Sequence, residues 1–171
     1  EPGDEMLITG LEHPALNSPS AVLEQRRGLT VKRAEISPRA SADECITAIK
    51  QGITPHTKLV ALSHVMFTCG LRVPATDIVR VAHEAGLPVL LDGAQTGGQI
   101  AIDMDEIGAD YYTVSGQKWL LGPTGSGALY INRERQPELT PLLTAPGLDS
   151  RSGLAMHTLA SQGVVARAGF A

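Results

Sequence analysis

The chain has 171 residues, of which 43% are hydrophobic and 19% are charged, and its formal net charge is −4 at pH 7. This length and composition fit one α/β domain or part of a larger one. Because the lysines and arginines are scattered rather than clustered, the sequence indicates neither a nucleic-acid surface nor a membrane-binding patch. The composition favours chemistry on a small molecule.

Cysteine usage and hydropathy indicate in which compartment the protein is expected. Cys45 and Cys69 show no CxxC spacing and lie in no histidine cluster, so we expect neither a disulfide framework nor a metal site. No apolar run approaches the ~20 residues needed to span a bilayer, and no secretory signal pattern is present. We therefore expect a soluble, cytoplasmic protein. Cys45 lies on a helical pattern and is expected in the core, and Cys69 is expected to pack as a small residue.

Short apolar runs and helical patterns alternate along the chain. In chain order they predict a strand at 6–8, a helix at 20–27, a strand at 30–36, a helix at 42–50, a strand at 59–62, a helix at 74–85, and strands at 89–91, 111–114 and 128–131. Such alternation is typical of a three-layer α/β sandwich, with a mostly parallel sheet covered by helices on both faces. Prolines interrupt the pattern after residue 136, so 137–152 is predicted to be a loop.

Two polar tetrapeptides follow buried strands. Residues 92–95 read Asp-Gly-Ala-Gln, and residues 115–118 read Ser-Gly-Gln-Lys. Ligands of parallel sheets bind beyond the carboxyl ends of the strands, so Asp92 and Lys118 are expected to reach one site. An anchored lysine and a carboxylate facing a ring nitrogen are what pyridoxal 5′-phosphate requires. The sequence therefore predicts a pyridoxal-phosphate site.

Each residue of this set also has a structural interpretation. Lys118 precedes Trp119, Leu120 and Leu121, an apolar setting that favours the reactive free amine, although a lone lysine can equally be a surface residue. Asp92 can pair with a pyridine nitrogen or simply stabilise a turn. Gln95 can donate to the phenolic oxygen of the cofactor or lie exposed in a loop.

Further candidates flank these segments. Ser115 and Gln117 are expected to bind phosphate. The glycine-rich run 122–127 precedes a strand rather than a helix, so it is expected to shape the connection beneath Lys118. His13 follows the first strand and either stacks on a cofactor ring or lies in a surface turn. For His64 a structural hydrogen bond is favoured over a substrate role.

With these motifs in place, the chain resembles the class V aminotransferase family of fold-type I pyridoxal-phosphate enzymes. This family includes cysteine desulfurases, selenocysteine lyases and isopenicillin N epimerase. The resemblance implies that Lys118 forms the Schiff base and that Asp92 pairs with the pyridinium. It assigns the remaining contacts as follows: Gln95 to the phenolic oxygen, His13 to ring stacking, and Ser115 and Gln117 to the phosphate. It also implies an amino-acid substrate and a homodimer.

Two positions depart from the desulfurase pattern. Gln117 stands where many desulfurases have histidine, and Phe67 stands where they usually have an asparagine that helps to hold cofactor and substrate. Because Phe67 cannot make that hydrogen bond, the pattern favours an epimerase-like or lyase-like member, with desulfuration and transamination as other branches.

The resemblance places residues 1–171 in the central part of the large, cofactor-binding domain. It implies that an amino-terminal phosphate loop and a carboxy-terminal small domain are missing, so that the chain alone is not expected to complete a catalytic cycle. A non-catalytic scaffold or regulatory module with the same fold is the alternative. A nucleotide-binding domain is disfavoured, because no GxxxxGK[ST] or GxGxxG motif opens a helix.

Overall fold

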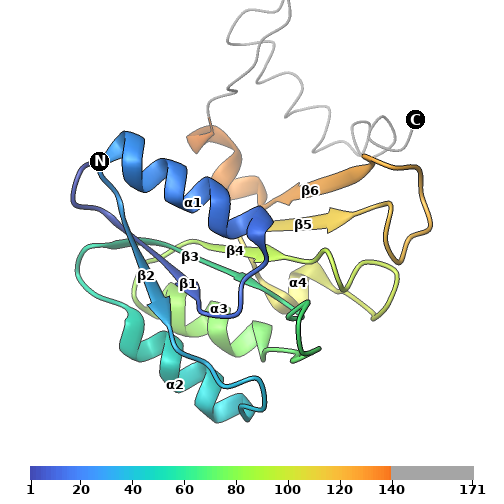
Figure 1. Cartoon of the computed structure of the whole chain (residues 1–171), viewed down its shortest axis with the longest axis horizontal. Helices are drawn as coiled ribbons and strands as arrows, with labels where there is room; N and C mark the ends of the chain where they lie inside the picture. The colour runs from blue at the N-terminus through green and yellow to red at the C-terminus, as the bar shows by residue number, and fades with distance from the viewer. Residues whose placement is uncertain (140–171) are drawn as a thin grey trace, which may run out of the picture.

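The computed structural model describes residues 1–139 of the chain, and its centre is one six-stranded sheet (Figure 1). The strands run in the spatial order β2-β1-β3-β4-β5-β6; the first five are parallel, and β6 is antiparallel to β5. Their bounds are β1 Glu5–Thr9, β2 Thr30–Ala34, β3 Thr57–Ser63, β4 Val89–Asp92, β5 Tyr111–Ser115 and β6 Gly127–Ile131. All six predicted strands are confirmed, with ends that differ by one to a few residues.

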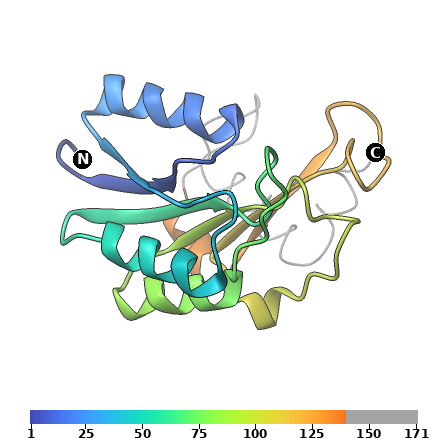
Figure 2. The same cartoon turned by 60° about the horizontal axis from the view of Figure 1, so that its bottom comes forward.

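Helices cover both faces of the sheet, as predicted. Helix α1 lies on one face, and α2 and α3 lie on the other, which gives three layers (Figure 2). The helical bounds are α1 Pro14–Arg27, α2 Ala42–Gly52, α3 Ala75–Glu84 and α4 Met104–Ile107, followed by a 3-10 helix, η1, at Arg133–Glu138. Within residues 1–139 we find no helix that is both long enough and apolar enough to cross a membrane.

The alternation of side chains along β1 divides the core between these two layers. Leu7 is fully buried and belongs to the larger cluster with Ile49 of α2 and Ile78 of α3. Its neighbours Met6 and Ile8 point to the other face, where the smaller cluster includes Leu16 of α1. Successive residues of a strand face opposite sides, so an uninterrupted apolar run is the pattern expected when both faces are covered.

Helix boundaries differ from the predictions where caps decide them. Helix α1 begins at Pro14 rather than residue 20, because the Nδ1 atom of His13 accepts a hydrogen bond from the Ala15 N–H at 3.0 Å and so caps the helix. Helix α2 begins at Ala42 as predicted, after a capping box of Ser41 and Glu44. Helix α3 spans one residue less at each end than predicted.

Three local features lie outside the predictions or contradict them. Neither α4 nor η1 was predicted, because each is too short to show periodicity. Pro137, the first residue of the predicted loop, belongs to η1, and the part of that loop from residue 140 onward lies outside the described residues. Cys45 is buried as predicted, whereas Cys69 is exposed in a turn, so its predicted packing role is wrong.

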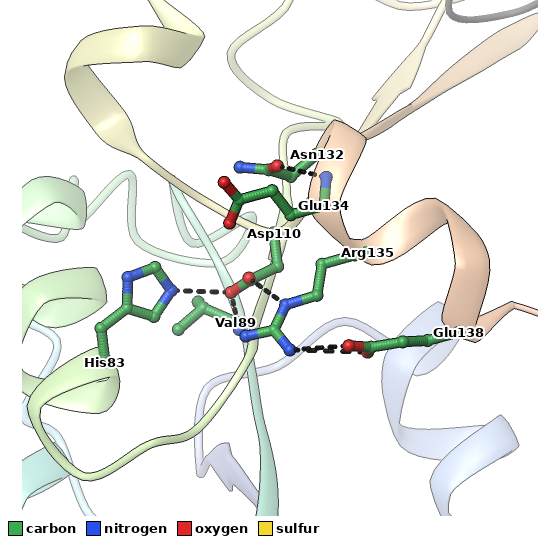
Figure 3. A network of polar contacts seen from close by, with 7 residues as sticks. All are labelled: His83, Val89, Asp110, Asn132, Glu134, Arg135 and Glu138. Carbon is green, nitrogen blue, oxygen red and sulfur yellow. Dashed lines mark hydrogen bonds and ion pairs between the residues drawn. The ribbon is translucent and has the colours of Figure 1, made fainter.

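A network of hydrogen bonds lies at the edge of the sheet where β4 and β5 begin (Figure 3). The buried carboxylate of Asp110 accepts hydrogen bonds from His83 Nε2 at 2.8 Å, the Val89 N–H at 2.7 Å and Arg135 Nε at 2.7 Å. Burial raises the pKa of Asp110, but the donors from His83, Arg135 and Val89 outweigh it and hold the pKa below its usual value. The network ties α3, β4 and η1 together at this edge.

Candidate active site

A small pocket lies at the opposite edge, beyond the carboxyl ends of β1, β3, β4 and β5. Strand register places Ser63 beside Asp92 and Asp92 beside Thr113. The pocket is lined by His13, Ser63, Val65, Phe67, Asp92, Ala94, Gln95 and Lys118. Four residues predicted from sequence, His13, Asp92, Gln95 and Lys118, therefore come together from separate segments of the chain.

Asp92 both stabilises a turn and faces the pocket. Its Oδ1 atom accepts hydrogen bonds from the Ala94 N–H at 2.9 Å and from Thr113 Oγ1 at 3.3 Å. Its Oδ2 atom has no hydrogen-bond partner among residues 1–139. One carboxylate oxygen is thus fixed by the fold, and the other remains free to bind a ligand; the turn and site interpretations are compatible.

Lys118 is partly buried in a tight turn built on the glycine-rich segments around it. The Leu121 N–H donates to the Lys118 carbonyl at 3.1 Å, and the Gly122 N–H donates to the Gly116 carbonyl at 2.8 Å. A Cβ atom at Gly116 would lie 2.5 Å from Ser126 Oγ, so only glycine allows this close approach. The lysine amine forms no ion pair within the described part of the chain. This agrees with the prediction that the glycine-rich run shapes the connection beneath Lys118.

Gln95 and His13 are oriented by neighbouring groups. Trp119 Nε1 donates to Gln95 Oε1 at 2.9 Å, which leaves the amide NH₂ of Gln95 as the group that can donate. Because His13 Nδ1 accepts from the Ala15 N–H, the proton of its neutral ring lies on Nε2. The Phe67 ring meets His13 edge to face, with centroids 4.6 Å apart and an interplanar angle of 81°.

Ser115 and Gln117 are not among the residues that line the pocket. Gln117 is exposed, and its Oε1 accepts a hydrogen bond from the Gly125 N–H. Ser115 ends β5, where it pairs with Gly127 of β6. Phosphate binding by these two residues stays a prediction.

His64 has the structural role that the sequence favoured. Its Nδ1 lies 2.8 Å from Tyr112 Oη, which is in turn 2.6 Å from Thr96 Oγ1. The Thr96 hydroxyl also donates to the Gly93 carbonyl at 2.9 Å. Burial, reinforced by the charge of Arg72, lowers the pKa of His64 to about 4, so the ring is neutral at pH 7. This buried network supports the turn that follows Asp92.

One residue of this edge received no role from sequence. Glu12 is 5% exposed, and its carboxylate accepts hydrogen bonds from Ser63 Oγ and Thr9 Oγ1, both at 2.6 Å. The Ser63 N–H adds contacts of 3.0 and 3.1 Å to the two carboxylate oxygens. The only sequence signal for Glu12 was weak, namely that it directly precedes His13 after the first strand.

Known proteins are similar to this chain in sequence and fold. The chain is 42% identical to a probable cysteine desulfurase of Mycolicibacterium paratuberculosis, over 82% of this chain and 20% of that protein. It is 34% identical to the isopenicillin N epimerase of Amycolatopsis lactamdurans, over 81% of this chain and 35% of that protein. The chain thus spans about a third or less of the length of these relatives.

Solved structures agree. A complex of the cystine C-S lyase C-DES with cysteine persulfide superposes with a TM-score of 0.80 at 30% identity, over 85% of this chain and 39% of that one. The cysteine desulfurase CsdA of Escherichia coli gives a TM-score of 0.78 at 29% identity, over 86% and 36% of the two chains. A C-DES mutant carries glycine covalently linked to its PLP cofactor.

The fold is therefore that of part of the large domain of fold-type I pyridoxal-phosphate enzymes, as predicted. The family model described as aminotransferase class-V matches residues 1–169. That match covers nearly all of the chain. The chain belongs to the aminotransferase class-V family.

Proposed function

We propose that this chain is the central part of the large domain of a pyridoxal-phosphate enzyme that acts on an amino acid. The observation that carries the proposal is the convergence of Lys118 and Asp92 in one pocket with His13 and Gln95. On this proposal the complete protein is a cytoplasmic homodimer that takes a small-molecule substrate, as in the family that the sequence resembles.

The donor set fits the cofactor. Asp92 offers the free Oδ2 atom to a protonated ring nitrogen, and the Gln95 amide offers a donor to the phenolic oxygen. Lys118 offers an amine that no carboxylate of the described residues neutralises. When bound, pyridoxal phosphate supplies an electron sink for the α-carbon of an amino acid. Asp92, Gln95 and Lys118 thus each have a matching function on this one cofactor.

The roles of the chain's own residues follow from this arrangement. Lys118 would hold the cofactor covalently through Nζ, and its amine, when free, would accept the α-proton of the substrate as a general base. Asp92 would hold the ring nitrogen and favour its protonated form through the charge of its carboxylate. His13 would stack on the ring, and its orientation is fixed by the cap that it forms on α1.

The branch of chemistry rests on Phe67. Its ring lines the pocket and contacts His13, so an apolar edge stands where a hydrogen-bonding amide is usual in desulfurases. We propose elimination or epimerisation rather than desulfuration. With L-cysteine as substrate, pyruvate, ammonia and hydrogen sulfide would support elimination, and racemised substrate would support epimerisation. Alanine as the main product would contradict this assignment.

The test of the cofactor proposal uses the full-length protein. After reduction with borohydride, mass spectrometry is expected to find a phosphopyridoxyl group on the peptide that contains Lys118. The Lys118→Ala variant should lose this adduct. Lys58→Ala, which removes an exposed lysine of β3, is the matched control and should keep it. An adduct on another lysine, or none in the wild type, would overturn the proposal.

A further inference from the structure

The buried carboxylate of Glu12 has no part in the chemistry proposed above, yet it lies directly behind the pocket. Every side-chain contact that the structure gives it comes from a donor: Ser63 N–H, Ser63 Oγ and Thr9 Oγ1. Glu12, Ser63 and Thr9 are each at most 5% exposed. A carboxylate without its charge partner in the core is costly unless several donors satisfy it, and here both oxygens are satisfied.

These contacts join two segments that are far apart in sequence. Glu12 and Ser63 are separated by 51 residues, and their hydrogen bonds fasten the turn after β1 to the end of β3. The Glu12 carbonyl also accepts from Asn17 Nδ2 at 2.7 Å, which anchors the same turn to α1. The next residue in the chain is His13, so the position of the His13 ring depends on this anchoring.

The same contacts set the polarity of Ser63. A serine hydroxyl has one proton, and Ser63 gives it to Glu12 Oε2 at 2.6 Å. Ser63 also lines the pocket with Lys118. Toward the pocket, the Ser63 oxygen can therefore act only as a hydrogen-bond acceptor. It can accept from the N–H groups of an amine, but it has no proton to donate to a carboxylate or phosphate oxygen.

We propose that Glu12 is a positioning residue of the active site: its carboxylate fixes the turn that carries His13 and makes Ser63 a hydrogen-bond acceptor toward the amine of Lys118 or of the substrate. This inference rests on the proposed cofactor. It adds a carboxylate that acts through His13 and Ser63 without touching the cofactor itself.

The main test is Glu12→Gln in the full-length protein. A glutamine keeps the size of the side chain but brings an NH₂ group against donors, so the turn must shift or a hydroxyl must reverse its proton. We expect pyridoxal phosphate to bind the apoprotein at least about tenfold more weakly, because small displacements of positioning groups have large effects. The visible circular dichroism of the bound cofactor should change as well.

Asp110→Asn is the matched control. It is the same acid-to-amide change at a carboxylate that is 3% exposed and held by donors, but at the other edge of the sheet. It should lower the unfolding temperature, as Glu12→Gln does, while leaving cofactor affinity within about twofold, since distant sites behave independently. If Glu12→Gln matches Asp110→Asn in leaving affinity and circular dichroism unchanged, Glu12 is only structural and the inference is wrong.

Ser63→Ala tests the second half of the inference and serves if Glu12→Gln does not fold. Removing an acceptor disfavours the protonated form of a nearby amine. The midpoint of the pH-dependent change in the visible absorbance of bound pyridoxal phosphate should therefore move to lower pH. An unmoved titration would overturn the acceptor role of Ser63. Wild-type protein that fails to bind pyridoxal phosphate at all would instead overturn the proposed function, so the two failures are distinguishable.

Discussion

The two edges of the sheet each hold an aspartate that accepts hydrogen bonds from the fold, but the two carboxylates are satisfied to different degrees. At the edge where β4 and β5 begin, Asp110 has both oxygens engaged by His83, Val89 and Arg135, and its negative charge is matched by a guanidinium. At the carboxyl edge, Asp92 has one oxygen engaged and one free. A saturated carboxylate stabilises the fold, whereas a half-satisfied one is available for a ligand.

Asp92→Ala should produce the largest effect and would separate the two edges most clearly. Removing the charge beside the ring nitrogen should lower kcat/KM of the full-length enzyme about a thousand-fold or more, since preorganised charge is usually the largest catalytic term. The free energy of unfolding of the apoprotein should change little, because Asp92 is only partly buried. Steady-state kinetics and chemical denaturation measure the two quantities. A large loss of stability with unchanged kcat/KM would reverse the comparison.

Asp110→Ala should show the opposite profile. The substitution leaves the Val89 N–H without its acceptor and removes one of the two carboxylates that Arg135 contacts, so we expect a loss of about 3 kcal/mol, the low end for breaking a buried ion pair. Urea denaturation of the apoprotein should show this loss. Titration of pyridoxal phosphate into the folded variant should give the wild-type affinity. Weaker cofactor binding would mean that the two edges are coupled.

Lowering the pH should lower the free energy of unfolding, because the buried His64 is neutral in the folded chain. Because the pKa of His64 is about 4 in the folded chain and 6.5 is its ordinary value, the unfolded chain binds a proton that the folded chain refuses between these pH values. The His64 contribution is fully present above pH 6.5, and about 3 kcal/mol of stability is lost as pH falls from 6.5 to 4.

The measurement is the free energy of unfolding of wild type and His64→Gln from pH 7 to pH 4. The difference between the two slopes isolates His64 from Asp110 and other carboxylates. The pKa of Asp110 is held below its ordinary value of 3.8, so the stability that this carboxylate contributes is lost mostly below pH 4, outside this range. Equal slopes for the two proteins would contradict the assignment of this pH dependence to His64.

Tyr112→Phe should have the smallest effect and would show how closely the buried network is tied to the site. It removes the hydroxyl that links His64 to Thr96 but keeps the ring that packs against Gly93, so we expect a loss of about 1–2 kcal/mol in the free energy of unfolding. Cofactor affinity should stay within about twofold, since Thr96 keeps its bond to the Gly93 carbonyl. A clear loss of affinity would show that this network also positions Asp92.

Much of the site could be predicted because parallel sheets place strand ends together. The polar residues that follow apolar strands, Asp92 and Lys118, had to meet at one edge once the strands were parallel, and His13 follows the same rule after β1. Spacing alone could not predict which side chains turn inward. Ser115 and Gln117 lie in the same tetrapeptide as Lys118, yet neither lines the pocket in the described structure.

The amino-acid sequence by itself determined the sheet, its helical layers and the family, because apolar periodicity and a few fixed motifs depend on neighbouring residues. Only the tertiary structure decided the roles of Glu12 and Asp110. Their partners lie on other strands and helices, so strand register and helix packing, which no local pattern encodes, select which oxygen is satisfied and which stays free. The sequence thus indicated Lys118 and Asp92 as candidates for one site, and the fold identified two further buried carboxylates, Glu12 at the same edge and Asp110 at the opposite edge.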